Sequence, residues 1–246
     1  MGDREGCELE KDHYMNSTKN RENSPNLPVN ELAVREYYNR HACDYEDKFH
    51  RDDPVRQREQ EDIADNIKEI FRERRVLEIA CGSGFWTAEL VKIADKILAT
   101  DTSPEMLKEA RQKGFPRSVI EFRQVDAYQL DAIPEKFDAG LAAFWFSHVP
   151  KVKIKQFLSG FHDRLTANSP VFMVDNVYIP GIGGELIAEK SDENSYKLRH
   201  LLDGTEHKIL KNYYDAEALR HIFAPWTDKM DIHIGECFWH IKYITR

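Results

Sequence analysis

Three acidic residues occupy equivalent places in a sequence that alternates apolar runs with helical patterns. Glu78 lies inside the run RRVLEIA, Asp101 ends KILATD, and Asp126 ends IEFRQVD. Each run is typical of a buried strand, so the three carboxylates are expected near the carboxyl ends of consecutive strands. Open α/β sheets bind ligands in a crevice at those ends, and an acid there accepts hydrogen bonds from ribose hydroxyls. The acids therefore predict a ligand-binding crevice at this edge of the sheet.

The segment between the first strand and the next helix is built from small residues. Ala80-Cys81-Gly82-Ser83-Gly84 follows Glu78 after one residue. Small side chains let a ligand approach the backbone, and the following helix begins with free N–H groups. Because alanine stands at position 80, this residue is expected to avoid positive φ. The loop lacks the third glycine of a GxGxxG dinucleotide fingerprint, where it has Thr87. Alone, it also fits an ordinary strand-to-helix turn.

The elements that position these residues follow from periodicity and punctuation. Strands are expected over 74–80, 96–101, 120–126, 137–146 and 170–179, helices over 31–50, 54–71, 85–94, 103–113, 152–165 and 216–223, and two final strands within 230–245, joined by a turn near Gly235. Ser103 is a candidate N-cap before Pro104, and Gly114 follows the same helix. The alternation predicts an α/β fold with a doubly wound, mostly parallel seven-stranded sheet that closes in an antiparallel hairpin.

Composition limits the class of protein. The 246 residues carry a formal charge of −8, and no apolar run is long enough to cross a membrane. A nucleic-acid partner is not expected because no long basic run offsets this charge. The N-terminus has no apolar signal segment, and the four cysteines (Cys7, Cys43, Cys81 and Cys237) are widely spaced. Both features favour a cytoplasmic location. The sequence carries no signal for the oligomeric state.

Three regions differ in their patterning. Residues 1–28 are polar and are expected to form a disordered tail. Residues 29–71 are expected to form a helical cap, and residues 72–246 the α/β domain. Within that domain, 180–212 has a mixed pattern and glycines at its start, which suggests an inserted lid-like segment.

The loop and the strand-end acids resemble those of class I S-adenosylmethionine-dependent methyltransferases. The resemblance covers about residues 72–178 and implies a Rossmann-like fold and S-adenosylmethionine as cofactor. It also implies that Asp101 meets the ribose, and that Asp126 and Ala127 meet the adenine. The cofactor residues expected on this basis are Tyr38, Glu78, Ala80, Gly82, Gly84, Asp101, Thr102, Met106, Asp126, Ala127 and Phe144.

The reacting site is expected after the fourth strand, in the segment AFWFSHVP. His148 is the candidate general base, because an unperturbed imidazole titrates near pH ~6.5; a structural role is the alternative. Substrate contacts are expected from Tyr45, Trp145, Asp175, Asn176 and Tyr178. Asp175-Asn176 resembles the ligand pair of magnesium-dependent O-methyltransferases, but the fourth strand lacks the acid that such enzymes also use. We therefore expect no metal.

Three functions are compatible with these features. The leading hypothesis is methyl transfer to an oxygen or nitrogen of a small metabolite, because the acidic charge, the helical cap and the inserted segment favour an enclosed pocket. The alternatives are an RNA or protein methyltransferase, which needs a basic or open surface, and a non-catalytic S-adenosylmethionine-binding protein.

Overall fold

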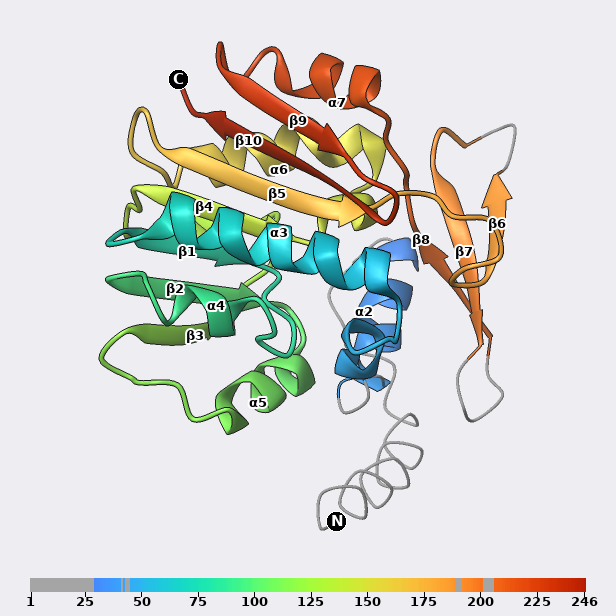
Figure 1. Ribbon diagram of the computed structural model, residues 1–246, viewed down its shortest axis with the longest axis horizontal. Helices are drawn as coiled ribbons and strands as arrows, with labels where there is room; N and C mark the ends of the chain where they lie inside the picture. The colour runs from blue at the N-terminus through green and yellow to red at the C-terminus, as the bar shows by residue number, and fades with distance from the viewer. Residues whose placement is uncertain (1–28, 41, 43–44, 189–191, 201–205) are drawn as a thin grey trace.

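A computed structural model describes residues 29–40, 42, 45–188, 192–200 and 206–246 (Figure 1). The tail expected over residues 1–28 lies outside the described residues. Among the described helices, none has both the length and the hydropathy needed to cross a bilayer.

A seven-stranded sheet forms the centre of the molecule. Its order is β3-β2-β1-β4-β5-β10-β9, and β10 runs antiparallel to both β5 and β9 while the other pairs are parallel. The strands are β1 (Arg75–Ile79), β2 (Lys96–Asp101), β3 (Ile120–Gln124), β4 (Ala139–Ala143), β5 (Pro170–Asn176), β9 (Met230–Ile234) and β10 (Phe238–Ile244). The predicted parallel sheet with a closing hairpin is confirmed. Its central strands are buried on both faces, which explains their continuous apolar runs.

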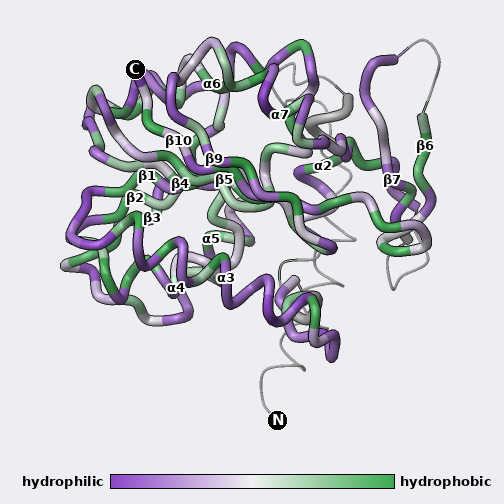
Figure 2. Tube along the Cα trace, turned by 45° about the horizontal axis from the view of Figure 1, so that its top comes forward, coloured by the Kyte–Doolittle hydropathy of each residue, from purple (hydrophilic) through white to green (hydrophobic). Residues whose placement is uncertain are grey.

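Helices cover both faces of this sheet. On one face, α3 (Pro54–Phe71) and α4 (Thr87–Leu90) pack against side chains such as Val76 and Leu141. On the other, α6 (Ile154–His162) and α7 (Ala216–Phe223) pack against Leu77 and Met173. The helix α5 (Pro104–Gln112) lies beside β2 and β3. Figure 2 shows hydrophobic residues concentrated along the central strands and hydrophilic ones along the outer turns.

Two predicted helices differ from the structure. The continuous helix expected over 31–50 is wrong: α2 (Val29–Arg40) ends at Arg40, and Tyr45–Phe49 forms a separate 3₁₀ turn, η2. In this turn the ring of Phe49 stacks on Phe85 at 4.1 Å between centroids, so burial of aromatic surface overrides the helical periodicity. The helix expected over 85–94 is shorter at both ends, because only Thr87–Leu90 is α-helical.

The segment 180–212 contains a second, three-stranded antiparallel sheet that the sequence did not predict. It consists of β6 (Glu185–Ala188), β7 (Ser195–His200) and β8 (Glu206–Leu210), in the order β6-β7-β8. Val34 of α2 packs with Tyr196, Ile209 and Leu210 in a small core of its own. Figure 1 shows α2 beside β8, at one end of the main sheet. We call α2 and this small sheet together the cap.

Candidate functional site

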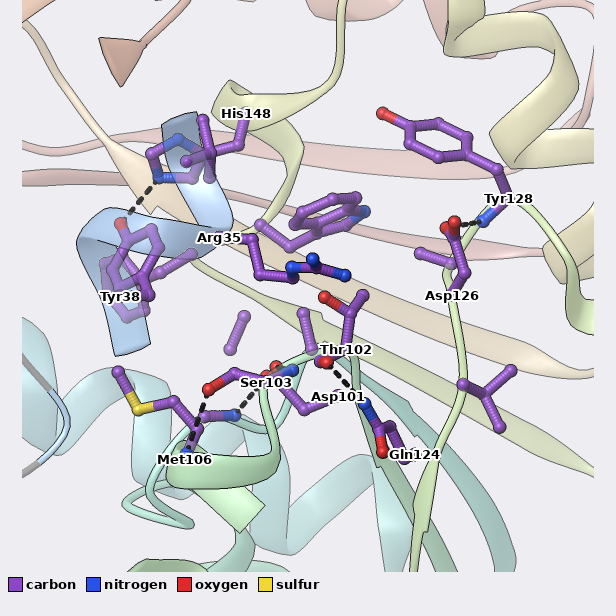
Figure 3. A pocket seen from close by; sticks show the side chains of 18 of the residues that line it. Arg35, Tyr38, Asp101, Thr102, Ser103, Met106, Gln124, Asp126, Tyr128 and His148 are labelled. Atoms are coloured by element: carbon purple, nitrogen blue, oxygen red, sulfur yellow. Dashed lines mark hydrogen bonds between the residues drawn. The ribbon is translucent and has the colours of Figure 1, made fainter. Parts of the chain in front are cut away.

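A cavity of about 340 Å³ opens at the carboxyl ends of β1 to β4, under α2 (Figure 3). Its wall includes the end of each of these strands: Ala80 and Gly82 after β1, Asp101 and Thr102 at β2, Asp126 and Ala127 after β3, and Phe144 after β4. This is the position at which open α/β sheets bind ligands. The size lies within the usual range for small-molecule sites, roughly 300–1,000 Å³. We call it the strand-end cavity.

The loop after β1 alternates left-handed residues. Ala80, Gly82 and Gly84 have φ values of 53°, 56° and 83°. The expectation that Ala80 avoids positive φ is therefore wrong. The two residues after Ala80 anchor the loop to β2. Cys81 N–H donates to the Thr100 carbonyl and Gly82 N–H donates to Asp101 Oδ2, both at 2.9 Å. These bonds hold alanine in a conformation that costs about 1–2 kcal/mol.

Gly84 serves packing and does not line the cavity. A Cβ at this position would lie 3.2 Å from Ala110 Cβ of α5 and 3.4 Å from the ring of Phe115. Its glycine therefore allows a close approach between the loop and α5, in addition to a positive φ.

Asp101 and Asp126 both line the strand-end cavity and also hold its backbone. Asp101 accepts from Gly82 N–H through one oxygen and from Ser103 N–H, at 2.8 Å, through the other. Asp126 accepts from Tyr128 N–H at 2.8 Å through Oδ1 alone. Because a carboxylate oxygen can accept two hydrogen bonds, both acids retain capacity for a ligand. Burial raises the pKa of Asp101, while the backbone N–H groups lower it.

Glu78 does not line the cavity. Its side chain is 1% exposed and accepts from Thr87 Oγ1 at 2.8 Å, while its carbonyl accepts from Thr100 Oγ1 at 3.0 Å. Burial raises the pKa of Glu78 to about 8. The structure thus places this acid beneath the loop, where it joins β1 to α4 and β2.

Tyr38 and His148 lie over the strand-end cavity and join the cap to the main domain. His148, in the 3₁₀ turn η4 (Phe146–His148), is buried, with its Nε2 2.9 Å from the hydroxyl oxygen of Tyr38 on α2. Its Nδ1 lies 2.7 Å from the Leu210 carbonyl of β8. A carbonyl only accepts, so Nδ1 carries a proton; in the neutral ring Nε2 then accepts from Tyr38. Burial raises the pKa of Tyr38.

A second cavity, of about 420 Å³, lies on the other side of this pair. Tyr38, Tyr45, Phe144 and His148 line both cavities. The remaining wall comes mainly from residues 49–56, from the segment after β5, from the cap and from the segment after β8. It is rich in cations: Arg51, Arg56, Lys197, Arg199 and Lys211. We call it the cationic cavity.

Three predicted substrate residues lie at the edge of the cationic cavity or behind it. Asn176 lines it, whereas Asp175 lines neither cavity and is fully buried. Asp175 accepts from Lys211 Nζ at 2.9 Å and from Ser147 N–H at 2.8 Å. Although burial opposes ionisation, the charge and hydrogen bond of Lys211 hold the pKa of Asp175 low, at about 2. Tyr178 also lines neither cavity and is 40% exposed.

The structure thus brings most of the predicted residues together. The strand-end cavity is lined by nine of the expected cofactor residues: Tyr38, Ala80, Gly82, Asp101, Thr102, Met106, Asp126, Ala127 and Phe144. It is also lined by Tyr45, Trp145 and His148. The indole Nε1 of Trp145 is buried and has no partner among the described residues, so it can donate to a ligand.

Sequence reasoning missed Arg35 and the cationic residues. Arg35 lines the strand-end cavity, and Figure 3 shows its side chain extending from α2 toward Thr102 and Asp126. Its spacing of three from Tyr38 on one helix was the available signal, because residues three apart share a helix face. Lys197, Arg199 and Lys211 had no such signal, because the small sheet itself was not predicted.

Comparison with known proteins agrees with this geometry. Residues 76–168 match the family described as "Methyltransferase domain". A curated relative, an uncharacterized methyltransferase of Schizosaccharomyces pombe, is 34% identical over 80 residues. That match spans 31% of this chain and 30% of the relative, so it covers less than a third of the relative's length.

Solved structures match over much more of the chain. The DhpI–SAH complex is 25% identical, with a TM-score of 0.66, and the match covers 86% of this chain and 94% of that one. Magnesium protoporphyrin IX methyltransferase from Synechocystis PCC 6803, with bound SAH, matches with a TM-score of 0.62 at 14% identity, over 88% of this chain and 100% of the other. The second match shows the fold alone.

Proposed function

We propose that this chain, which is a class I S-adenosylmethionine-dependent methyltransferase, transfers the cofactor's methyl group to an oxygen or nitrogen of a small metabolite. The observation that carries the proposal is the strand-end cavity. It joins the acids at the ends of β2 and β3 to the small-residue loop after β1, and it shares Tyr38, Phe144 and His148 with a second cavity. Two adjacent cavities suit a reaction between a cofactor and a separate acceptor.

The strand-end cavity fits a nucleoside cofactor in its polar groups. Asp101 would receive the ribose hydroxyls, and Asp126 the adenine amino group, since each acid keeps accepting capacity. Ala80 and Gly82 would let the rest of the cofactor approach the loop backbone. Glu78 would support the loop from below through Thr87. Phe144, which has a φ of 59° and lines both cavities, would separate cofactor from acceptor.

When bound, the cofactor supplies a methyl group on a positively charged sulfur. An acceptor atom bonds to the methyl carbon from the side opposite the sulfur, and the carbon–sulfur bond breaks. Much of the acceleration comes from holding the acceptor in that line. The cap covers both cavities and limits the entry of water.

A protonated acceptor must also lose a proton, and Tyr38 and His148 provide a route for it. The Tyr38 oxygen takes the acceptor's proton while its own proton passes to His148 Nε2, 2.9 Å away. His148 becomes an imidazolium, and the positive charge lost from sulfur reappears on the imidazole. His148 is therefore the general base acting through Tyr38, with the Leu210 carbonyl fixing its tautomer.

Binding of S-adenosylhomocysteine, measured by calorimetry, tests the cofactor site. Replacing Asp126 by Asn keeps the acceptor for Tyr128 N–H but places an amide N–H₂ where the adenine amino group needs an acceptor. We expect the affinity to fall about tenfold. Asp131→Asn, an exposed residue that lines neither cavity, is the matched control. The proposal fails if the wild-type protein does not bind S-adenosylhomocysteine, or if both variants bind it equally well.

Transfer itself is tested with cofactor labelled in its methyl group and a fractionated metabolite extract. We expect label in small molecules and its loss in Asp101→Asn. Label only in RNA or protein would replace the small-metabolite substrate by a macromolecular one.

A further inference from the structure

We propose that the cationic cavity binds the oxyanion of a small acidic substrate, a phosphate or a carboxylate, and presents the rest of that molecule to Tyr38 and His148. The inference rests on the proposed function, because it names the substrate class of the same site. The oxyanion is the group by which the substrate is recognised, and the methylated oxygen or nitrogen is a different atom.

The wall of the cationic cavity is positively charged, whereas the chain as a whole is negatively charged. The protein has 43 acidic and 35 basic residues, yet the wall of this cavity holds five cationic side chains and, among the described residues, no carboxylate. Lys211 is neutralised by Asp175 from behind the wall. For the other four (Arg51, Arg56, Lys197 and Arg199) no salt bridge to a carboxylate is found in the part of the chain that the structure describes. Such an excess of charge in an enclosed space favours an anion.

The cap contributes its cations through strand alternation. Lys197 and Arg199 are two residues apart on β7 and share a face, and the register sets Lys197 opposite Ile209 on β8. Lys197 is almost fully buried, and its Nζ donates to the carbonyls of Ile182 and Gly184 at 3.2 and 2.8 Å. Burial, with Arg199 and Lys211 nearby, lowers its pKa. A bound anion would offset this unfavourable environment and stabilise the charged form of the side chain.

Gly183 makes room for the guanidinium of Arg199. A Cβ at Gly183 would lie 2.6 Å from Arg199 Nη1 and 3.1 Å from Nη2. The glycine-rich turn before β6 thus lies in close contact with this guanidinium, and both line the cavity. Arg199 offers paired N–H donors, which suit the two oxygens of a carboxylate or phosphate.

The opposite wall belongs to the main domain. Arg56, in the first turn of α3, is buried, with its guanidinium carbon 4.6 Å from the centre of the Phe238 ring. Its Nε has no hydrogen-bond partner among the described residues. Burial and the neighbouring Arg51 lower the pKa of Arg56. An anion between Arg56 and Arg199 would thus join the main domain to the cap and close the site.

The wall shared by the two cavities determines what reacts. An oxyanion held by the cations fills the far side of the cationic cavity, so the remainder of the substrate extends toward Tyr38, Tyr45, Phe144 and His148. The acceptor atom then lies between the proton route and the strand-end cavity. This arrangement selects acids that carry a hydroxyl or amino group at a distance from the acid.

Anion binding is tested on protein already saturated with S-adenosylhomocysteine, with inorganic phosphate in one arm and acetate in the other. The variants are Arg51→Gln and Arg199→Gln, with Arg58→Gln and Lys155→Gln as controls that remove exposed charges outside both cavities. We expect each cavity variant to weaken binding of the favoured anion at least about tenfold, and the controls to leave it unchanged. Affinity for S-adenosylhomocysteine should stay the same in all four. Equal anion binding in cavity variants and controls overturns the inference, and so does a loss of S-adenosylhomocysteine affinity, which would assign the cations to the cofactor.

A second measurement separates this inference from the proposed function. Metabolites are divided by anion exchange and offered with labelled cofactor. We expect the label in the retained, acidic fraction; loss of the labelled acceptor after phosphatase treatment identifies a phosphate, and its survival a carboxylate. Label confined to the unretained fraction overturns the acidic substrate while leaving methyl transfer intact. Failure to bind S-adenosylhomocysteine removes the proposed function itself.

Discussion

The hydroxyl of Tyr38 and Nε2 of His148 lie 2.9 Å apart, although 110 positions separate the two residues in the chain. The contact joins α2 to the turn after β4, and both side chains line both cavities. On its other side the imidazole is held by the Leu210 carbonyl. One histidine therefore connects α2, the main sheet and the small sheet, so the proton transfer that we propose would depend on the position of the cap.

Removing either member of this pair should slow methyl transfer with little effect on cofactor binding. For His148→Gln and for Tyr38→Phe we expect kcat to fall by about 10²-fold or more, the range for loss of a general base. Because the two act in series, the double variant should be no slower than the slower single variant. Steady-state rates with the labelled cofactor measure all three.

Tyr178→Phe is the control, since it removes the same hydroxyl from a residue that lines neither cavity. Near-normal turnover of His148→Gln would contradict the base role and leave His148 as a structural residue. Rates that multiply in the double variant would show that the two residues do not share one proton route.

The strain at Ala80 predicts that glycine there stabilises the protein. The φ of 53° costs an alanine about 1–2 kcal/mol, whereas glycine loses about 0.5–1 kcal/mol through its more flexible unfolded chain. The difference should raise the free energy of unfolding of Ala80→Gly by up to about 1.5 kcal/mol, as measured by urea denaturation. In Ala88→Gly, within α4, the same change should lower it by about 0.5–1 kcal/mol. A loss of stability in Ala80→Gly would show that its methyl contacts outweigh the strain.

Burial of Glu78 predicts a decline of stability with rising pH. Its pKa is about 8 in the folded protein against 4.5 in the unfolded chain, so between these values the folded state binds the additional proton. Stability from this group is complete below pH 4.5 and is lost as pH rises toward 8. Relative to Glu78→Gln, which keeps an acceptor for Thr87, the wild-type protein should lose about 1–2 kcal/mol between pH 6.5 and 8. Urea denaturation at both pH values measures it, with the exposed Glu61→Gln as control; parallel curves would contradict it.

The main sheet could be predicted because its strands are buried on both faces. Runs such as RVLEI and PVFMVDN are mainly apolar, and the turn near Gly235 separates the two strands of the hairpin. The strand ends follow from the strands, which is why Asp101 and Asp126 were found. Their neighbours in space, Tyr38 and His148, were named separately, but nothing in the sequence joined them.

The small sheet was not predicted because its strands are short. SYKLRH does alternate, with Tyr196 and Leu198 between Lys197 and Arg199, but an alternation over so few residues also occurs in loops and helices. The prediction for the φ of Ala80 was wrong because it considered only the local sequence. Its conformation is imposed by the partners of Cys81 and Gly82, Thr100 and Asp101, which lie about twenty residues away. The residues next to Ala80 in the sequence do not indicate these hydrogen bonds to β2.

The buried pair of Lys211 and Asp175 predicts a large asymmetric effect of mutation. Lys211 Nζ lies 2.6 Å from Ser147 Oγ and 2.9 Å from Asp175, and both charged residues are buried. Lys211→Met leaves the carboxylate buried without its cation, which should lower the free energy of unfolding by about 3–5 kcal/mol. The double variant with Asp175→Asn should recover most of this loss, because the amide oxygen can still accept from Ser147 N–H. Urea denaturation of both variants measures the difference.

The exposed pair of Lys92 and Glu89 provides the comparison for this effect. Its N···O distance of 2.7 Å is shorter than that of the buried pair, yet solvent screens it. Lys92→Met should therefore change stability by less than about 1 kcal/mol. If Lys211→Met lost no more than Lys92→Met, water would have to reach Asp175 in the variant, and the carboxylate would then be available to the cationic cavity. Failure of Asp175→Asn to rescue the double variant would instead attribute the loss to the packing of the lysine stem and to its bond with Ser147.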